Sequence, residues 1–215
     1  LSASILSVPG GLMLSKIVVP PQKGVRTLND LKKISTPKFK NALEALTQGA
    51  SDGMLLSLNI VAMLIAFLAI INIVNFALFS VSGWLAEAGF QYFPESLESI
   101  LGFIFQPFGY LMSVPADEAE KLGMLIGKKI SLNEFLAYAD LGEMIRNGDI
   151  SVRTAKLATF ALCGFANFGS IAIQIGGLGG LVPEKKSELA QLGLKAMFTG
   201  ALVNILNAVI AGLFI

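Results

Sequence analysis

Long uncharged, apolar stretches alternate with short charged ones along the chain. One stretch without a charged residue runs from Gly53 to Ala86, and another runs from Leu157 to Pro183. A transmembrane helix needs about 20 mainly apolar residues, so both stretches are long enough to cross a bilayer. The pattern predicts an all-α membrane protein, because helices satisfy their own backbone hydrogen bonds in lipid.

The start of the chain divides into two segments. Residues 1–19 are apolar up to a pair of prolines, and we interpret them as the end of a transmembrane helix. Residues 20–56 combine a basic connector with an amphipathic stretch from Asn41 to Leu56, which predicts a helix lying at the membrane surface. The excess of lysine and arginine in the connector indicates a cytoplasmic position.

Two apolar segments follow. Residues 57–86 predict a long transmembrane helix. Its asparagines, among them Asn75, are more typical of contacts between helices than of ligand binding. Residues 97–115 are apolar but contain Pro107, which favours an interfacial segment over a further span.

Residues 116–147 predict a re-entrant hairpin of two short helices. Acidic residues open the first helix, which we expect to end near Lys128 and Lys129. Ser131 and Glu134 have the spacing of a capping box and would start the second. Each arm has about 12–14 residues, so it is too short for a membrane core about 30 Å thick. Such a hairpin needs protein or a water-filled cavity around its tip.

The last two segments are predicted to cross the membrane. Residues 150–182 predict a transmembrane helix with a polar interruption, and residues 187–215 predict the final one. If the helix of residues 150–182 continued without a break, its residues Asn167, Ser170 and Gln174 would share one face. Such a polar stripe at membrane depth is costly unless a polar group meets it. A neighbouring helix and a passing solute are both possible partners.

Glu134 is the strongest single candidate for a functional residue. A carboxylate near the middle of a membrane costs about 2.5–3.5 kcal/mol, so it is usually paired and functional. The alternative is that it only caps its own helix. A carboxylate together with the amides and hydroxyl of the stripe suits a polyhydroxylated ligand, and the ring of Phe165 suits a flat one. We expect Lys128 and Lys129 to extend toward the interface or to lie in a loop.

The composition supports a membrane protein and excludes several functions. Of the 215 residues, 54% are hydrophobic and 14% are charged, whereas about a quarter are charged in soluble domains. The chain has no histidine and one cysteine, which excludes a zinc site or a Ser-His-Asp triad within it. We expect no enzyme activity and no metal or cofactor. The net charge of +1 argues against nucleic acid as a partner.

Because the chain starts with Leu1 inside an apolar run, we expect upstream residues to be missing.

Several motifs together resemble the C-terminal part of the concentrative nucleoside transporters, and the resemblance covers nearly the whole chain. The motifs that carry it are Asn133-Glu134-Phe135-Leu-Ala-Tyr138, Ala161-Leu-Cys-Gly-Phe-Ala-Asn-Phe168, Ser170-Ile-Ala-Ile-Gln-Ile-Gly-Gly-Leu-Gly179, Pro183-Glu-Lys-Lys-Ser-Glu-Leu-Ala-Gln-Leu-Gly193, Asn59-Ile-Val-Ala-Met-Leu-Ile-Ala-Phe67 and Ser7-Val-Pro-Gly-Gly-Leu-Met-Leu-Ser-Lys16.

The resemblance implies import of nucleosides by sodium or proton symport, in a homotrimer within a bacterial inner membrane. Residues 57–86 would belong to the scaffold, and the hairpin would be the second of two. The parts that bind the nucleobase and the coupling cation would lie upstream of Leu1. Glu134, Asn167 and Ser170 would bind ribose. The other candidate substrate contacts are Phe165, Ile173, Asn133 and Gln174.

Two other functions stay open. One is a related nucleoside-recognition gate protein that binds without concentrating its ligand. The other is a structural membrane subunit whose polar residues only hold helices together.

Overall fold

The computed structural model describes residues 1–20, 39–90 and 93–215. The described residues form helices and no strand, which confirms the all-α fold class. Most of the basic connector lies outside the described residues. The elements are α1 (Ser2–Val18), α2 (Ala42–Glu87), α3 (Leu97–Leu111), α4 (Ala116–Ser131), α5 (Glu134–Asn147), α6 (Val152–Leu162), α7 (Phe168–Leu181), a 3₁₀ turn (Pro183–Lys185) and α8 (Lys186–Gly212).

Helix α2 is one continuous helix of 46 residues, about 69 Å long at 1.5 Å per residue. The stretch from Asn41 to Leu56, expected as a separate surface helix, is its beginning. That boundary is wrong because no proline or turn interrupts the helix there. The Asn41 side chain caps it by accepting a hydrogen bond of 2.8 Å from the Glu44 N–H.

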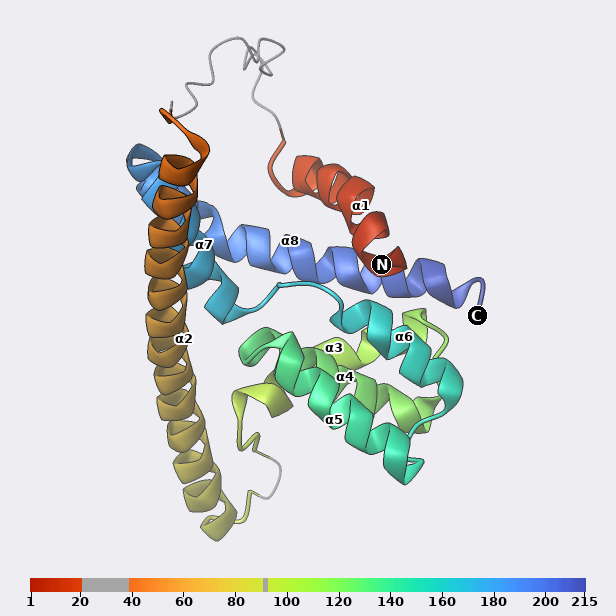
Figure 1. Cartoon of the computed structure of the whole chain (residues 1–215). Coiled ribbons are helices and arrows are strands. Elements are labelled where there is room, and N and C mark those ends of the chain that lie inside the picture. Colours follow the sequence, from red (N-terminus) through yellow and green to blue (C-terminus); the bar gives the residue numbers. More distant parts are fainter. Residues whose placement is uncertain (21–38, 91–92) are drawn as a thin grey trace.

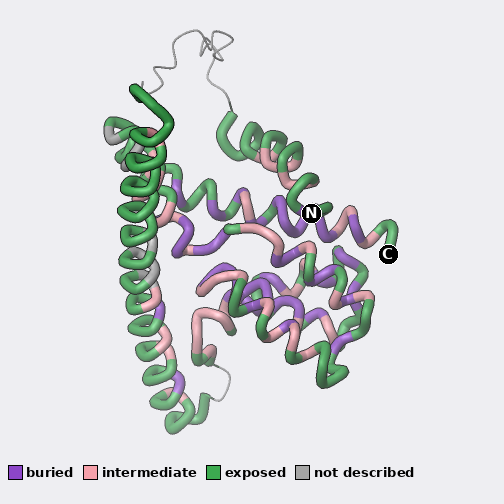
Figure 2. The backbone as a smooth tube through the Cα atoms, viewed as in Figure 1, coloured by how far each residue is buried: buried purple, intermediate pink, exposed green. Residues whose placement is uncertain are grey.

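Among the described residues, two helices are long and apolar enough to cross a membrane: Leu68–Glu87, within α2, and Lys186–Gly212. They differ in how much protein covers them. Only 11% of the apolar window in α2 is buried, against 50% of the window in α8. Figure 2 shows the same contrast, with α2 mostly exposed and α8 buried along much of its length. Helix α2 therefore presents an apolar surface, and α8 belongs to the core.

Helix α8 runs through the middle of the molecule, with α1 on one side and α6 and α7 on the other (Figure 1). The Asn207 side chain joins α8 to α1 by donating to the Ser7 hydroxyl at 2.8 Å and to the Ala3 carbonyl at 3.3 Å. Helix α1 continues through Pro9. At Gly10 an added Cβ would lie 3.3 Å from Val203 Cγ1, so the two helices are close together here.

Helices α3 and α4 pack backbone against backbone. An added Cβ at Gly123 would lie 2.5 Å from the Gly102 carbonyl oxygen, and one at Gly127 would lie 2.7 Å from the Glu98 carbonyl oxygen. Small residues allow this approach, as in membrane helix pairs. The segment that contains Pro107, for which an interfacial position was predicted, forms the continuous helix α3. Pro107 lies on the exposed face, away from this contact, where its missing N–H leaves no buried partner unpaired.

Asn75 joins α2 to the start of α3, as its predicted role between helices requires. Its Oδ1 accepts from the Leu97 N–H at 2.8 Å, and its Nδ2 donates to Glu98 Oε2 at 3.0 Å. The contact satisfies one of the free N–H groups that every helix has at its start. Helix α3, and through it the hairpin, is therefore attached to the long helix.

Helices α4 and α5 form the hairpin, with Leu132 and Asn133 between them. Their 16 and 14 residues correspond to about 24 Å and 21 Å. The helical hairpin of the predicted fold class is confirmed. Its apolar faces share a core with α6 and α8, built mainly from Leu122, Leu125, Ile126, Ile130, Ala137, Leu141, Leu157, Ala158, Leu162, Ala201, Ile205 and Ala208.

Candidate functional site

The site begins with a break in the backbone between α6 and α7. Helix α6 ends at Leu162 and α7 begins at Phe168, so the broken helix of the predicted fold class is confirmed. Gly164 has a φ of +151°. An added Cβ at Gly164 would lie 2.6 Å from Asn204 Oδ1 on α8. Only glycine combines this backbone conformation with this close approach.

Asn167 and Ser170 form a capping box at the start of α7. Asn167 Oδ1 accepts from the Ser170 N–H at 2.7 Å, and the Asn167 N–H donates to Ser170 Oγ at 3.2 Å. Both residues are buried. Asn167 precedes α7 instead of lying within it. The three side chains therefore do not share one helical face, as they would in an unbroken helix. Gln174 is exposed and Ile173 is half-buried.

The tip of the hairpin begins α5 with a different cap from the one predicted. Asn133 is the capping residue, and its Oδ1 accepts from the Leu136 N–H at 2.9 Å. Ser131 is the last residue of α4, and its hydroxyl donates to the Lys128 carbonyl at 3.3 Å. The predicted capping box of Ser131 and Glu134 is wrong because α4 extends through Ser131. Glu134 follows the cap directly and is not used to close its own helix.

The hairpin tip meets the break through Glu134. Asn167 Nδ2 donates to Glu134 Oε2 at 3.1 Å, which joins the first residue of α5 to the cap of α7. Two helix N-termini thus lie at one place, and both carry partial positive charge. Such half-helix N-termini are common at substrate sites of transporters with broken helices. The structure brings the predicted carboxylate and amide into contact.

Two more hairpin side chains hold the other end of the break. Lys129 Nζ donates to the Ala161 carbonyl at 3.0 Å, and Tyr138 OH donates to the Thr159 carbonyl at 2.8 Å. Both carbonyls lie in the last turn of α6, where no N–H of the same helix is available. Lys129 is only 1% exposed, so the expectation that it extends to the interface is wrong. Sequence reasoning missed both roles; the only signal was a lysine beside the hairpin turn.

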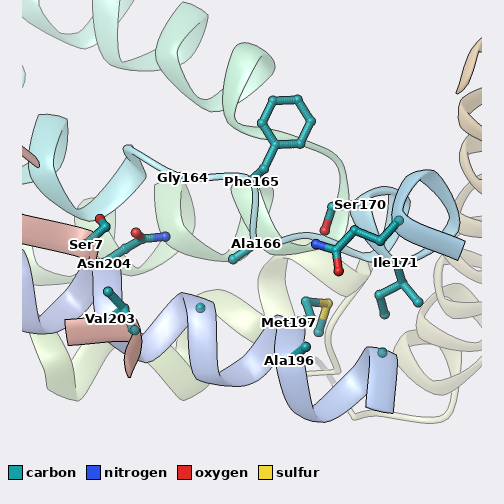
Figure 3. Close-up of a pocket in the computed structure, with 14 residues that line it drawn as sticks. Ser7, Gly164, Phe165, Ala166, Ser170, Ile171, Ala196, Met197, Val203 and Asn204 are labelled. Atoms are coloured by element: carbon teal, nitrogen blue, oxygen red, sulfur yellow. The ribbon is translucent and has the colours of Figure 1, made fainter. Parts of the chain in front are cut away.

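A cavity of about 230 Å³ lies on the other side of the break, between α1, α7 and α8 (Figure 3). Three of the predicted substrate contacts line it: Phe165, Ser170 and Gln174. The Phe165 ring points away from α8 in Figure 3 and is 63% exposed. Asn204, which sequence reasoning did not select, lies on the α8 wall beside Gly164. Ser170 thus contacts Asn167 on one side and borders the cavity on the other.

Within the part of the chain that the structure describes, no group of three acidic, cysteine or histidine side chains could hold a metal ion. The polar groups of the site are one carboxylate, amides, hydroxyls and a buried ammonium group. This set can exchange hydrogen bonds with a neutral, polyhydroxylated molecule.

Comparison with known proteins identifies the family of this chain. Residues 1–212 match the family model for the Na+ dependent nucleoside transporter C-terminus. The chain belongs to the concentrative nucleoside transporter family. This is a family of transporters, which confirms the prediction that the chain is not an enzyme.

The relatives include bacterial and human proteins. The chain is 44% identical to the uncharacterized transporter YutK of Bacillus subtilis, over 100% of the chain and 52% of that protein. It is 41% identical to the nucleoside permease NupC of Helicobacter pylori, over 100% of the chain and 50% of the permease. With the human sodium/nucleoside cotransporter 1 the identity is 38%, over 99% of the chain and 34% of the cotransporter.

Solved structures show the same fold. A variant of the transporter CNTnw in the intermediate 2 state is 38% identical, with a TM-score of 0.84, over 99% of this chain and 50% of that one. CNTnw in an inward-facing substrate-bound state is also 38% identical, with a TM-score of 0.73, over 99% of this chain and 49% of that one. The chain thus spans about half the length of the bacterial relatives and solved structures that it matches.

Proposed function

We propose that this chain is the C-terminal part of a secondary active transporter that imports nucleosides by sodium or proton symport. The observation that carries the proposal is the contact between Glu134 and Asn167. It places a carboxylate and an amide between two helix N-termini, at the tip of a hairpin and the break of a second helix. Membership in a nucleoside transporter family supports the substrate class.

The hydrogen-bonding groups suit the ribose of a nucleoside. The Glu134 carboxylate accepts hydrogen bonds from ribose hydroxyls, and Asn167 Nδ2 donates one to a ribose oxygen. Ser170 Oγ already donates to the Asn167 carbonyl at 2.6 Å, so it accepts from the ligand. Because ribose has both donors and acceptors at adjacent carbons, it can bridge the carboxylate and the amide and replace their direct contact.

The remaining predicted contacts have lesser roles in this proposal. The exposed Phe165 ring packs against the flat nucleobase. Asn133 uses its Oδ1 for the cap, which leaves its NH₂ group free to donate to the ligand. Ile173 contributes apolar contact, and Gln174 borders the cavity. The groups that choose between nucleobases and that bind the coupling cation belong to the other part of the transporter.

Transport proceeds by alternating access, in which the hairpin and the broken helix move together against α2. The relatives solved in intermediate and inward-facing states support such movement. The protein is a homotrimer in the bacterial inner membrane. The exposed apolar side chains of α2 would contact lipid and neighbouring subunits, among them Ile65, Ile70, Ile73, Phe76, Phe79 and Trp84.

Uptake of radiolabelled uridine by proteoliposomes that contain the full-length protein tests the proposal. Accumulation above the outside concentration is expected under an inward sodium gradient or an inward proton gradient, and each is imposed separately. Collapse of the effective gradient with an ionophore should abolish accumulation. Saturable uridine binding without accumulation under either gradient would favour the gate protein instead. Absence of both would favour a structural subunit.

A further inference from the structure

Helix α6 ends inside the protein, beside the substrate site, and a buried helix end needs compensation. The last carbonyls of a helix have no N–H partner within it, and they carry about half a negative charge. In transporters with broken helices, such C-terminal ends commonly coordinate the coupling cation. The positive group that compensates the end of α6 therefore affects the neighbouring substrate site.

A lysine of the chain itself occupies that position. Lys129 Nζ lies 3.0 Å from the Ala161 carbonyl oxygen, and the side chain is 1% exposed. The neighbouring lysine behaves differently: Lys128 pairs with Asp140 on the surface of the hairpin, and its side chain is 30% exposed. Two adjacent lysines of one helix turn thus have opposite environments, and only Lys129 faces the break.

We propose that Lys129 is a positioning residue whose ammonium group acts as a tethered cation at the end of α6, in the place where a bound ion would otherwise lie. A lysine in the interior is stable only with opposite charge nearby. The C-terminal ends of α6 and of α4 supply part of it, and the carboxylate of Glu134, at the start of the next helix, also attracts the ammonium group. Tyr138 reinforces the arrangement through its bond to Thr159.

The tethered cation acts on substrate through Glu134. Lys129 ends one arm of the hairpin and Glu134 begins the other, so fixing Lys129 to α6 fixes the tip opposite Asn167. The carboxylate is then held ready for ribose without an ion that must bind and leave. This inference rests on the proposed function for its effect on nucleoside affinity, but the ion-like role of Lys129 can be measured without nucleoside.

The test uses the full-length protein in detergent. Lys129→Met keeps much of the side-chain volume and removes the charge, and Lys128→Met is the matched control on the same turn. Loss of a charged hydrogen bond should weaken uridine binding by about tenfold or more for Lys129→Met, with little change for Lys128→Met. Calorimetric titration measures the affinity, and thermal unfolding without nucleoside measures stability.

Lys129→Ala separates an ion-like role from packing. The cavity it leaves can admit methylammonium, which has N–H donors, but tetramethylammonium has none and serves as the control for ionic strength. Methylammonium should raise the unfolding temperature of Lys129→Ala relative to its effect on wild type, and tetramethylammonium should not. Sodium ions should also stabilise this variant more than they stabilise wild type.

Equal effects of both ammonium ions and no added response to sodium would show a packing role and overturn the proposal. If neither Lys129→Met nor Lys129→Ala folds, Lys129→Arg is the variant to examine. A folded Lys129→Arg protein would support a required positive charge, and an unfolded one would overturn the proposal. Because the unfolding experiment contains no nucleoside, its failure would leave the proposed transport untouched. Conversely, absence of uridine uptake by wild type would not change the response to methylammonium.

Discussion

Two asparagine–glutamate pairs in this molecule have almost the same geometry and different surroundings. Asn75 donates to Glu98 at 3.0 Å and accepts a backbone N–H at 2.8 Å. Asn167 donates to Glu134 at 3.1 Å and accepts a backbone N–H at 2.7 Å. Hydrogen-bond lengths therefore do not distinguish a contact between helices from a candidate binding site.

What differs is the number of helix N-termini that meet at each pair. Asn75 lies within the continuous helix α2, and both of its partners, Leu97 and Glu98, belong to the start of α3. Asn167 caps α7 and reaches across to α5, at a place where α6 has just ended. Only the second pair combines two helix N-termini with a break in the backbone. That combination makes polar groups available to a ligand in the membrane.

The first and largest effect is expected from a substitution at the backbone break between α6 and α7. Gly164→Ala places a Cβ 2.6 Å from Asn204 Oδ1 on a residue with a φ of +151°. Strain and overpacking together should lower the free energy of unfolding by about 2–4 kcal/mol. Thermal or denaturant unfolding of the full-length protein measures the change.

The matched control for this substitution is Gly142→Ala. Gly142 lies within α5, and an added Cβ there is 3.8 Å from Arg146 Nη1, an ordinary contact. Alanine should stabilise the helix by up to about 1 kcal/mol. Equal stability of the two variants would mean that the break is not specified by Gly164.

The second test exchanges the two carboxylates for amides. Glu134→Gln should weaken nucleoside binding by about 1.5–3 kcal/mol, which is roughly a 10- to 100-fold loss, because a charged acceptor is lost. Glu98→Gln should leave the affinity within about twofold, since its partner only joins α2 to α3. Equilibrium binding of labelled uridine compares them. A similar loss in both variants would remove the distinction between the pairs.

The third test shortens the two asparagines. Asn75→Ala should lower the free energy of unfolding by about 1 kcal/mol, since contacts of this kind between membrane helices contribute about that much, and should leave uridine affinity unchanged. Asn167→Ala should reduce affinity as well as stability. The quantity to compare is the ratio of affinity loss to stability loss in each variant. Affinity loss in Asn75→Ala at full stability would contradict the assignment.

The smallest effect is expected at a third glutamate, at the opposite end of α4 from the hairpin tip. Glu118 accepts from the Ser151 N–H at 2.8 Å and from its hydroxyl at 2.9 Å. It lies outside the two spans found in the described residues. Partial burial acts to raise the pKa of Glu118, but hydrogen bonds from Thr154 and Ser151 and the charge of Lys121 together lower it below 4.5.

A lowered pKa in the folded state means that this carboxylate stabilises the fold above pH 4.5 and loses that contribution as the pH falls through the lower value. The contribution should be about 0.5 kcal/mol or less, because the site is near solvent. Unfolding temperatures of wild type and Glu118→Gln should differ at neutral pH and converge in acid. A constant difference across that range would exclude the ionised carboxylate as the cause.

Much of this architecture could be predicted from local sequence features. The uncharged stretches around Asn75 and Asn167 indicated membrane helices, and the short arms around Glu134 indicated a hairpin. Segment boundaries were less predictable. The beginning of α2 looked like a separate helix because its polarity changes, yet a change in polarity does not end a helix that has no proline or turn.

The candidate site was predicted in part. Glu134 was selected for its cost in a membrane and Asn167 for its place in an apolar segment, and the structure brings them together. The predicted capping residue of α5, Ser131, lies two positions before the actual one, because the end of α4 was predicted too early. The role of Lys129 was missed because its burial depends on α6. The carbonyl that Lys129 contacts belongs to Ala161, 32 residues further along the chain.

The sequence by itself determined an all-helical membrane protein, the hairpin, the broken helix and the family, because hydrophobicity, helix length and motifs are properties of neighbouring residues. Only the tertiary structure decided which asparagine joins two helices and which faces the candidate site. It also decided that one of two adjacent lysines is buried. Those outcomes depend on partners more than 20 residues away, and local periodicity contains no information about such distant contacts.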